Sequence, residues 1–186
     1  GFYSGSLMMR LDLDRPAATA LWKGENNRVL ENGIEVAETS GLHSVMTTPL
    51  VVGDHIYGIG SHGQVRGLLA ETGERVWEAE GLTTRNRWGS AYFIKHEDRY
   101  FVYNENGDLI IVRFSPDGYV ELDRTHLLNP TSRSGYGGAR PGSRGRTSHG
   151  QSDRLVVWAH PAFANRHIVL RNDEEIIRVS MDVNDY

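Results

Sequence analysis

Short hydrophobic runs separated by turn residues organise the stretch between positions 48 and 78. Runs of this length, broken by Gly-containing turns, are hairpin signals, and three hairpins in succession predict an antiparallel meander. A helical period of 3.6 residues is missing from the chain, so we expect an all-β protein. The four predicted strands of the meander are Thr48–Val52, His55–Ile59, Val65–Leu69 and Arg75–Glu78.

The same meander recurs along the chain, at a spacing of about 44 residues between the two middle copies. Four-stranded units that repeat every ~40–50 residues are typical of β-propeller blades. The first copy lacks its innermost strand and the last stops after its third. The third copy has Pro116-Asp117-Gly118 and no Trp afterwards, which indicates a degenerate blade. The third strands of the four copies are Leu7–Leu13, Val65–Leu69, Leu109–Phe114 and Glu175–Met181.

These repeats predict an all-β β-propeller arc of about four four-stranded antiparallel blades. An isolated arc would expose two sheet edges, so we expect the C-terminal part of a propeller of roughly seven or eight blades. A self-closed four-bladed ring, and a sandwich or irregular β domain, are the alternatives. Residues 1–186 are taken as one domain, with insertions at Gly24–Gly41 and Asn129–Asp153.

Alternation within the strands also predicts the blade cores, and Trp22 and Trp77 are expected to lock adjacent blades together. The expected core residues are Leu7, Leu11, Val51, Ile56, Tyr57, Val65, Leu68, Phe93, Ile94, Phe101, Leu109, Ile111, Phe163, Ile168, Ile176 and Val179.

Charge and composition narrow the classes of function. The formal net charge is −4, so no overall field favours nucleic acid or an anionic membrane. The absence of cysteine excludes disulfides, thiolate metal sites, Cys nucleophiles and iron–sulfur clusters. The chain starts with Gly1 inside a strand-like run, so we take it for a processed or excised piece in which a missing targeting signal is uninformative.

The segment Leu69–Trp77 resembles the Thr-Gly-x-x-x-Trp docking motif of pyrroloquinoline-quinone-like propeller repeats. In that family the Trp of one blade packs on the neighbouring blade beside the peptide of the Thr-Gly turn. The resemblance therefore implies a blade-docking role for Trp22, Thr72, Gly73 and Trp77. The motif also has an Asp three residues before the Thr, where this chain has Leu69, a departure that weakens one docking hydrogen bond.

The tail resembles the last blade of exported, non-catalytic bacterial members of the same class, through Trp158–Asn165 and Arg171–Ile176. This resemblance implies a periplasmic or otherwise exported setting. Quinone dehydrogenases of the class carry a vicinal Cys pair and a Ca²⁺ site of Glu, Asn and Asp. The chain has no Cys and no matching oxygen cluster, so we expect no cofactor in this segment.

Metal and catalytic motifs are also missing. The eight histidines lack the spacing of a dedicated metal site, and no Gly-x-Ser-x-Gly elbow occurs. We therefore assign no metal ligand and no catalytic residue.

A channel-rim site is the first candidate for binding. Trp88 and Trp158 are aligned as equivalent positions before two innermost strands, and such strand starts face the channel mouth. In the alternative interpretation the two Trp side chains plug gaps between blades while His160 hydrogen-bonds backbone. The candidate rim residues are His43, Arg87, Trp88, Trp158 and His160.

An arginine-rich loop in the second insertion is the other candidate. Arg guanidinium groups match oxyanions in a bidentate manner, so the loop could grip an anionic partner. Alternatively it is a flexible connection that its charge keeps solvated. The first insertion is acidic and could contact it. The four arginines are Arg133, Arg140, Arg144 and Arg146.

The sequence therefore favours a non-enzymatic quinone-like propeller that presents its faces to another protein, to further blades or to a small ligand. The alternative is part of a quinone- and Ca²⁺-dependent dehydrogenase, or of a carbohydrate-acting enzyme, whose active site lies mostly in absent blades. No membrane span is visible, and nucleic acid is not an expected partner.

Overall fold

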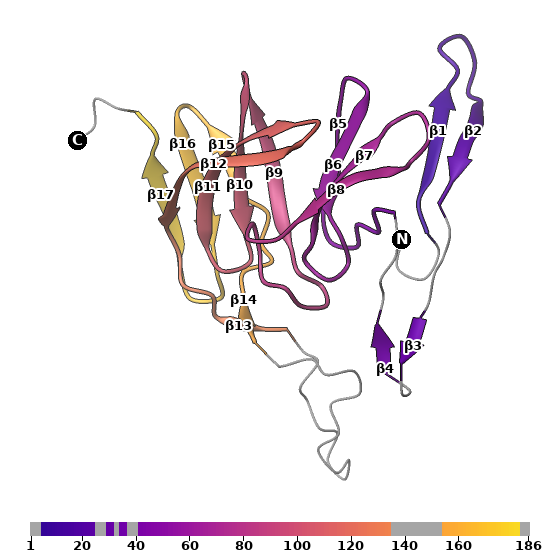
Figure 1. Ribbon diagram of the computed structural model, residues 1–186. Coiled ribbons are helices and arrows are strands. Elements are labelled where there is room, and N and C mark those ends of the chain that lie inside the picture. The colour runs from indigo at the N-terminus through magenta and orange to yellow at the C-terminus, as the bar shows by residue number, and fades with distance from the viewer. Residues whose placement is uncertain (1–4, 25–28, 32–33, 37–40, 135–153, 183–186) are drawn as a thin grey trace.

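A computed structural model describes residues 5–24, 29–31, 34–36, 41–134 and 154–182, with only the backbone at 29–31 and 34–36. All regular elements in these ranges are β-strands, which form antiparallel sheets (Figure 1). The first sheet contains β1 (Leu7–Leu11) and β2 (Ala18–Lys23). The second contains β5 (Leu50–Val52), β6 (His55–Ile59), β7 (Val65–Leu69) and β8 (Arg75–Ala79). The third contains β9 (Ala91–His96), β10 (Arg99–Asn104), β11 (Asp108–Ser115) and β12 (Gly118–His126). The fourth contains β15 (Ala162–Ala164), β16 (His167–Arg171) and β17 (Ile176–Ser180).

Two short hairpins lie in the connections between sheets. The first pairs β3 (Val29–Glu31) with β4 (Ile34–Val36), and the second pairs β13 (Ser132–Arg133) with β14 (Leu155–Val156). Both project from the same end of the row of sheets (Figure 1).

The order of the sheets confirms the predicted propeller arc. The four sheets follow one another in chain order, with the first and the last at opposite ends of the row, so the chain does not close into a ring by itself (Figure 1). It is a partial β-propeller. The third copy, predicted to be a degenerate blade, forms a complete four-stranded sheet with β12, although it lacks the Trp.

Repeated glycines hold the turns between the second and third strands. Gly63 and Gly107 occupy the same place in two successive sheets and have positive φ angles of 85° and 84°. A Cβ atom on Gly63 would lie 2.1 Å from the Thr84 carbonyl oxygen, and one on Gly107 would lie 1.7 Å from that of Leu128. Both positions therefore require glycine for conformation and for space.

The cores lie between the sheets. Strand β10 alternates between two of them, because Tyr100 and Val102 pack toward the second sheet while Phe101 and Tyr103 pack toward the fourth. The third sheet is thus covered on both faces, which explains the continuous apolar runs in its three inner strands, Ala91–Ile94, Tyr100–Tyr103 and Leu109–Val112.

A β-bulge recurs at the same place in three sheets, between the third and fourth strands of the repeat. These strands are β1 and β2 in the first sheet, β7 and β8 in the second, and β11 and β12 in the third. The register shifts between Met8 and Met9, between Gly67 and Leu68, and between Ile111 and Val112. An extra residue on one strand changes the direction in which the next side chain points. The residues that follow the bulge are Trp22, Trp77 and Asp123.

The two tryptophans point from this bulge to the following sheet. The Trp22 Nε1 atom donates to the Ala70 carbonyl oxygen at 2.8 Å, and Trp77 Nε1 donates to that of Ser115 at 3.3 Å. The Trp22 ring lies against Gly73, where a Cβ atom would come within 2.8 Å of the indole. Thr72 lies in the same turn and accepts a hydrogen bond from the Glu74 amide.

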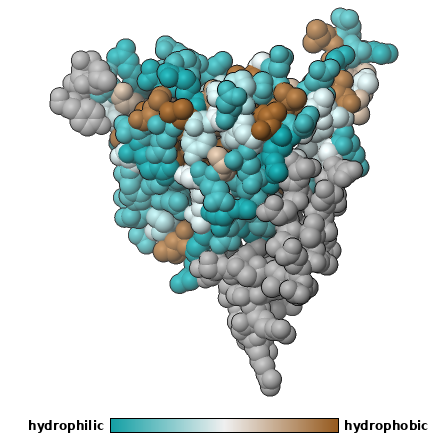
Figure 2. All heavy atoms as spheres, in the orientation of Figure 1, coloured by the Kyte–Doolittle hydropathy of each residue, from teal (hydrophilic) through white to brown (hydrophobic). Residues whose placement is uncertain are grey.

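Four expected core residues are instead exposed. Leu7 is 53% exposed, Leu11 69%, Val51 64% and Ile176 72%. Each lies on the face of its strand opposite to a residue that packs in an inter-sheet core, such as Met8. The prediction was wrong for these four, because alternation shows which residues share a face but not whether another sheet covers that face. The surface in Figure 2 is mostly hydrophilic, with separate hydrophobic patches along its upper edge, one at the tip of the β1–β2 hairpin.

Candidate functional site

Buried polar side chains gather at one end of the row of sheets, which we call the loop face. It consists of the turns between second and third strands and of the connections between sheets, and β13 and β14 project from it (Figure 1). Polar groups removed from water need hydrogen-bond partners, so this end must be a fixed network rather than a set of loose loops. Its buried polar residues are His43, Ser61, Gln64, Thr83, Arg87, Ser90, Asn104, Glu105, Ser134 and Asn172.

Glu105 is the centre of this network. Its side chain is 0% exposed and accepts two hydrogen bonds from Arg154, Nε to Oε1 and Nη2 to Oε2, both at 2.9 Å. The Trp158 Nε1 atom donates to Glu105 Oε2 at 3.1 Å, and the Val157 amide donates to the Glu105 carbonyl oxygen at 2.7 Å. One buried carboxylate thus holds the connection into the fourth sheet against the third.

The charge of Glu105 is balanced by close partners. Burial raises the pKa of the Glu105 carboxyl, and the Arg154 guanidinium and the Trp158 indole N–H oppose that rise. A two-point Arg–carboxylate contact with a third donor is the arrangement that offsets the desolvation of a buried charge.

Trp88 lies in a strained turn on the same face. Its φ angle is 67°, a left-handed conformation that is costly for a bulky side chain. The Trp88 amide donates to the Ser61 carbonyl oxygen at 2.8 Å, which fixes the turn. The Arg87 guanidinium carbon lies 5.6 Å from the centroid of the Trp88 ring, so the two side chains form a cation–π pair.

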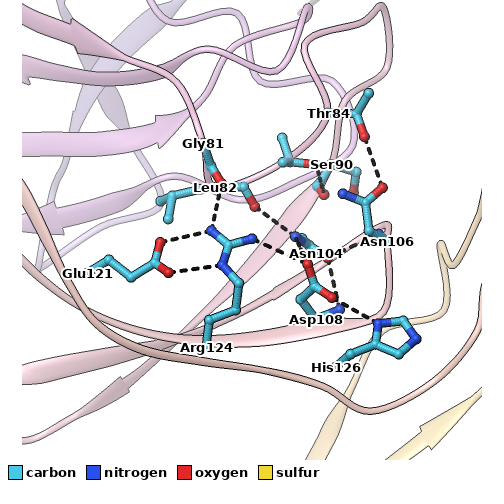
Figure 3. Close-up of polar contacts among 11 residues, drawn as sticks. Gly81, Leu82, Thr84, Ser90, Asn104, Asn106, Asp108, Glu121, Arg124 and His126 are labelled. Carbon is cyan, nitrogen blue, oxygen red and sulfur yellow. Dashed lines mark hydrogen bonds and ion pairs between the residues drawn. The ribbon is translucent and has the colours of Figure 1, made fainter.

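A second polar network joins the outer strand β12 to the connection between the second and third sheets (Figure 3). Arg124 donates to both carboxylate oxygens of Glu121 and to the Gly81 carbonyl oxygen. Arg124 also reaches Asp108 Oδ2 at 3.3 Å, and His126 Nδ1 lies 2.9 Å from Asp108 Oδ1. Asp108 thereby ties the end of β12 to the start of β11.

His126 bonds through both ring nitrogens. Its Nε2 atom lies 3.1 Å from the Asn129 Oδ1 atom, in addition to the contact with Asp108. These two hydrogen bonds raise the pKa of the His126 imidazole above its usual value of 6.5, and the bond to the Asp108 carboxylate has the larger effect. Protonation gives the ring two donors for these two acceptors.

The five predicted rim residues differ in burial and contact different neighbours. His43 and Arg87 are buried, and Trp88 and Trp158 are half-buried. His160 is exposed, with its ring 4.3 Å from that of Tyr92, and its Nδ1 atom lies 3.0 Å from the Pro161 carbonyl oxygen.

The alignment of the two tryptophans was wrong by two positions. The first hairpin of the third sheet closes at the pair His96–Arg99, and that of the fourth sheet closes at Ala164–His167. When these two pairs are superposed, Trp158 corresponds to Ser90 and not to Trp88. The sequence also missed Glu105 and Arg154, because their contact crosses 49 positions and the insertion between them. A Glu in the turn before Gly107 was the one local signal that could have pointed to it.

The arginine-rich loop lies mostly beyond the described ranges. Arg133 is exposed on β13, whereas Arg140, Arg144 and Arg146 lie outside the described residues. Within the described residues, no group of three or more His, Asp or Glu side chains could hold a metal ion. No helix long and apolar enough to cross a membrane occurs in the part of the chain that the structure describes.

Comparisons with known proteins bear on the fold. No protein-family model matches the chain, and no curated protein matches it. Among solved structures, the crystal structure of BamB from Moraxella catarrhalis is similar, with a TM-score of 0.51 at 14% sequence identity. The likeness covers 96% of this chain and 41% of that one, so the chain spans about two fifths of the length of the structure it matches. At this identity the likeness shows the fold alone.

Proposed function

We propose that this chain is part of a pyrroloquinoline-quinone-like β-propeller that binds a protein partner through its loop face, without catalysis, in an exported setting. The observation that carries the proposal is the strained Trp88 beside Arg87. A backbone strain of this kind persists only where the surroundings hold it, and such strain clusters at functional sites such as ligand clamps and switch regions. Trp is also among the residue types that contribute most to protein interfaces.

The buried network supports this role because it makes the loop face rigid. Glu105 and Arg154 fix the connection that carries Trp158 and His160, and the turn at Ser61 fixes Trp88. A surface that is ordered before binding loses less conformational entropy when a partner docks. The resemblance of the docking motif and of the tail to exported propellers supports the family and the setting, and the likeness to BamB supports the propeller fold.

Site-specific photo-crosslinking in the native host tests the proposal. A photoreactive amino acid at His160, which is exposed on the loop face, should yield a discrete crosslinked protein. The same group at Val120, which is 61% exposed on β12, is the matched control and should not yield that product.

The variant Trp88→Gly then identifies the residue responsible. Glycine adopts the positive φ of this turn without cost, so the substitution removes the indole and leaves the backbone relaxed. We expect the crosslink from position 160 to be lost while the fold is retained, with a lower melting temperature because a half-buried indole is removed. Equal products from both positions, or a crosslink that persists in Trp88→Gly, would contradict the proposal.

A further inference from the structure

The second and third sheets show how a docking tryptophan is held. Trp77 lies opposite Gly67, where a Cβ atom would come within 2.2 Å of the indole Nε1. Its ring stacks on Tyr57 with centroids 5.8 Å apart and on Phe114 at 6.4 Å. Tyr57 and Phe114 also stack on each other at 4.9 Å. The indole of the second sheet thus lies against an aromatic ring of its own sheet and one of the next, and these two rings also contact each other.

The third and fourth sheets have corresponding positions that contain neither the tryptophan nor the glycine opposite it. Asp123 follows the bulge where Trp77 does in the second sheet, and Ile111 replaces the glycine opposite it. Phe101 pairs with Ile111 as Tyr57 pairs with Gly67. Val179 of the fourth sheet corresponds to Val112 of the third sheet. Met181, two residues after Val179, therefore corresponds to Phe114 and packs against the third sheet.

A pocket of about 360 Å³ lies against two of these corresponding residues, Phe101 and Met181, while Ile111 and Asp123 do not line it. Phe101 and Met181 line it, together with Phe163, His96, Ala164 and His167. The His96, Phe101 and Phe163 rings form a column, with centroid spacings of 5.3 and 5.5 Å and interplanar angles of 21° and 14°. Small-ligand pockets have volumes of ~300–1,000 Å³, so this one can accept a single aromatic group.

The pocket lies at the end of the sheets opposite to the loop face. It is bordered by the β9–β10 and β15–β16 turns, which lie at the upper end in Figure 1. Residues in its rim carry backbone strain, since Asn165 and Arg166 have φ angles of 50° and 58°. Arg166 pairs with Asp182 at 2.7 Å and accepts a hydrogen bond from the Met181 amide, which holds these two residues after β17 against this turn.

We propose that this pocket binds the indole side chain of a partner polypeptide, in the place where the preceding sheet holds its own Trp77. Parallel aromatic rings and a thioether favour a flat, polarizable group. The Asp182 carbonyl oxygen corresponds to that of Ser115, which accepts the Trp77 N–H, so it is the acceptor for the incoming indole. This site is separate from the loop face and does not depend on the function proposed there.

Methyl NMR of the chain labelled at methionine tests the proposal. The chain has four methionines, so the Met181 methyl signal can be assigned with the single variant Met181→Leu. We expect N-acetyl-tryptophanamide to shift the Met181 signal saturably through its ring current and to leave Met8 and Met9 unmoved. N-acetyl-alaninamide should move none of them.

Two matched variants locate the binding. Ala164→Leu fills the pocket and should weaken the binding of N-acetyl-tryptophanamide at least tenfold. Ala162→Leu makes the same change two residues away, at a position that does not line the pocket, and should leave it unchanged. A Met181 signal that does not move, that moves equally with N-acetyl-alaninamide, or that shifts in Ala164→Leu as in the parent chain overturns the proposal.

A third variant keeps the test decisive if Ala164→Leu fails to fold. Ile111→Gly with Asp123→Trp restores the glycine and the tryptophan of the preceding sheet. The new indole should shift the Met181 signal without added probe and should abolish binding of N-acetyl-tryptophanamide. Binding that survives in this double variant refutes the correspondence between the two sets of positions.

Discussion

Replacing Glu105 by Gln should be among the most damaging single changes on the loop face. The substitution keeps the shape of the side chain but removes the charge that Arg154 requires, and Arg154 is only 14% exposed. Breaking a buried ion pair by removing one partner costs ~3–5 kcal/mol, since the remaining charge is buried without compensation. Some solvent reaches Arg154, so we expect a loss of about 3 kcal/mol in the free energy of unfolding.

Equilibrium unfolding in urea, followed by fluorescence, measures this loss. For a chain of this length 1 kcal/mol corresponds to ~2–4 °C, so the melting temperature should also fall by about 6–12 °C. The slope of the unfolding free energy against urea should not change, because the native fold is retained. Asp98→Asn is the control, since the exposed pair of Asp98 with Arg113 contributes little, and its midpoint should not move.

A double variant separates the buried charge from lost packing. Glu105→Gln with Arg154→Met removes both charges and should recover part of the loss, because an apolar pair of similar volume has no charge to desolvate. A Glu105→Gln midpoint equal to that of the parent chain would falsify the reasoning. A double variant no more stable than Glu105→Gln alone would equally show that the uncompensated charge is not the cause.

Two further changes test the docking tryptophan and the imidazole. Trp77→Ala should cost about 3 kcal/mol, the low end of the ~3–5 kcal/mol for deleting a large aromatic, because the indole is only half-buried; a thermal-melt shift near zero would show that it does not dock. The raised pKa of His126 means that its bonds to Asp108 and Asn129 stabilise the fold below pH 6.5 and that this contribution is lost as pH rises through the folded-state pKa. The melting temperature of the parent chain should therefore exceed that of His126→Gln most at low pH, and a gap that stays constant between pH ~5 and 9 would contradict this assignment.

The strands and turns could be predicted because their signals are local. The alternation in His55–Ile59 and Val65–Leu69 and the glycine at position 63 specify each hairpin without reference to the rest of the chain. Repetition then indicated the stacking, and Trp22 and Trp77 each donate a hydrogen bond to a carbonyl oxygen of the next sheet.

The contacts between sheets could not be predicted in the same way. Whether Leu7 or Ile176 is covered depends on a neighbouring sheet, which a strand's own alternation does not reveal. The pairing of Glu105 with Arg154 depends on the path of a long connection, and no local pattern encodes that path. The pocket beside Phe101 became visible only when the register of one sheet could be compared with that of the next.

The recurrent bulge also affects how the rim of the molecule behaves toward other chains. Strands β2, β8 and β12 are edge strands, and the extra residue in each is an apolar side chain turned to solvent: Leu21 at 44% exposure, Val76 at 42% and Leu122 at 42%. A straight, hydrophobic edge strand would be a template for aggregation. A strand interrupted by an unpaired residue cannot form a continuous ladder of hydrogen bonds with another chain. The insertion that directs the tryptophans inward therefore also protects the outer rim, and deleting that one residue would remove both properties together.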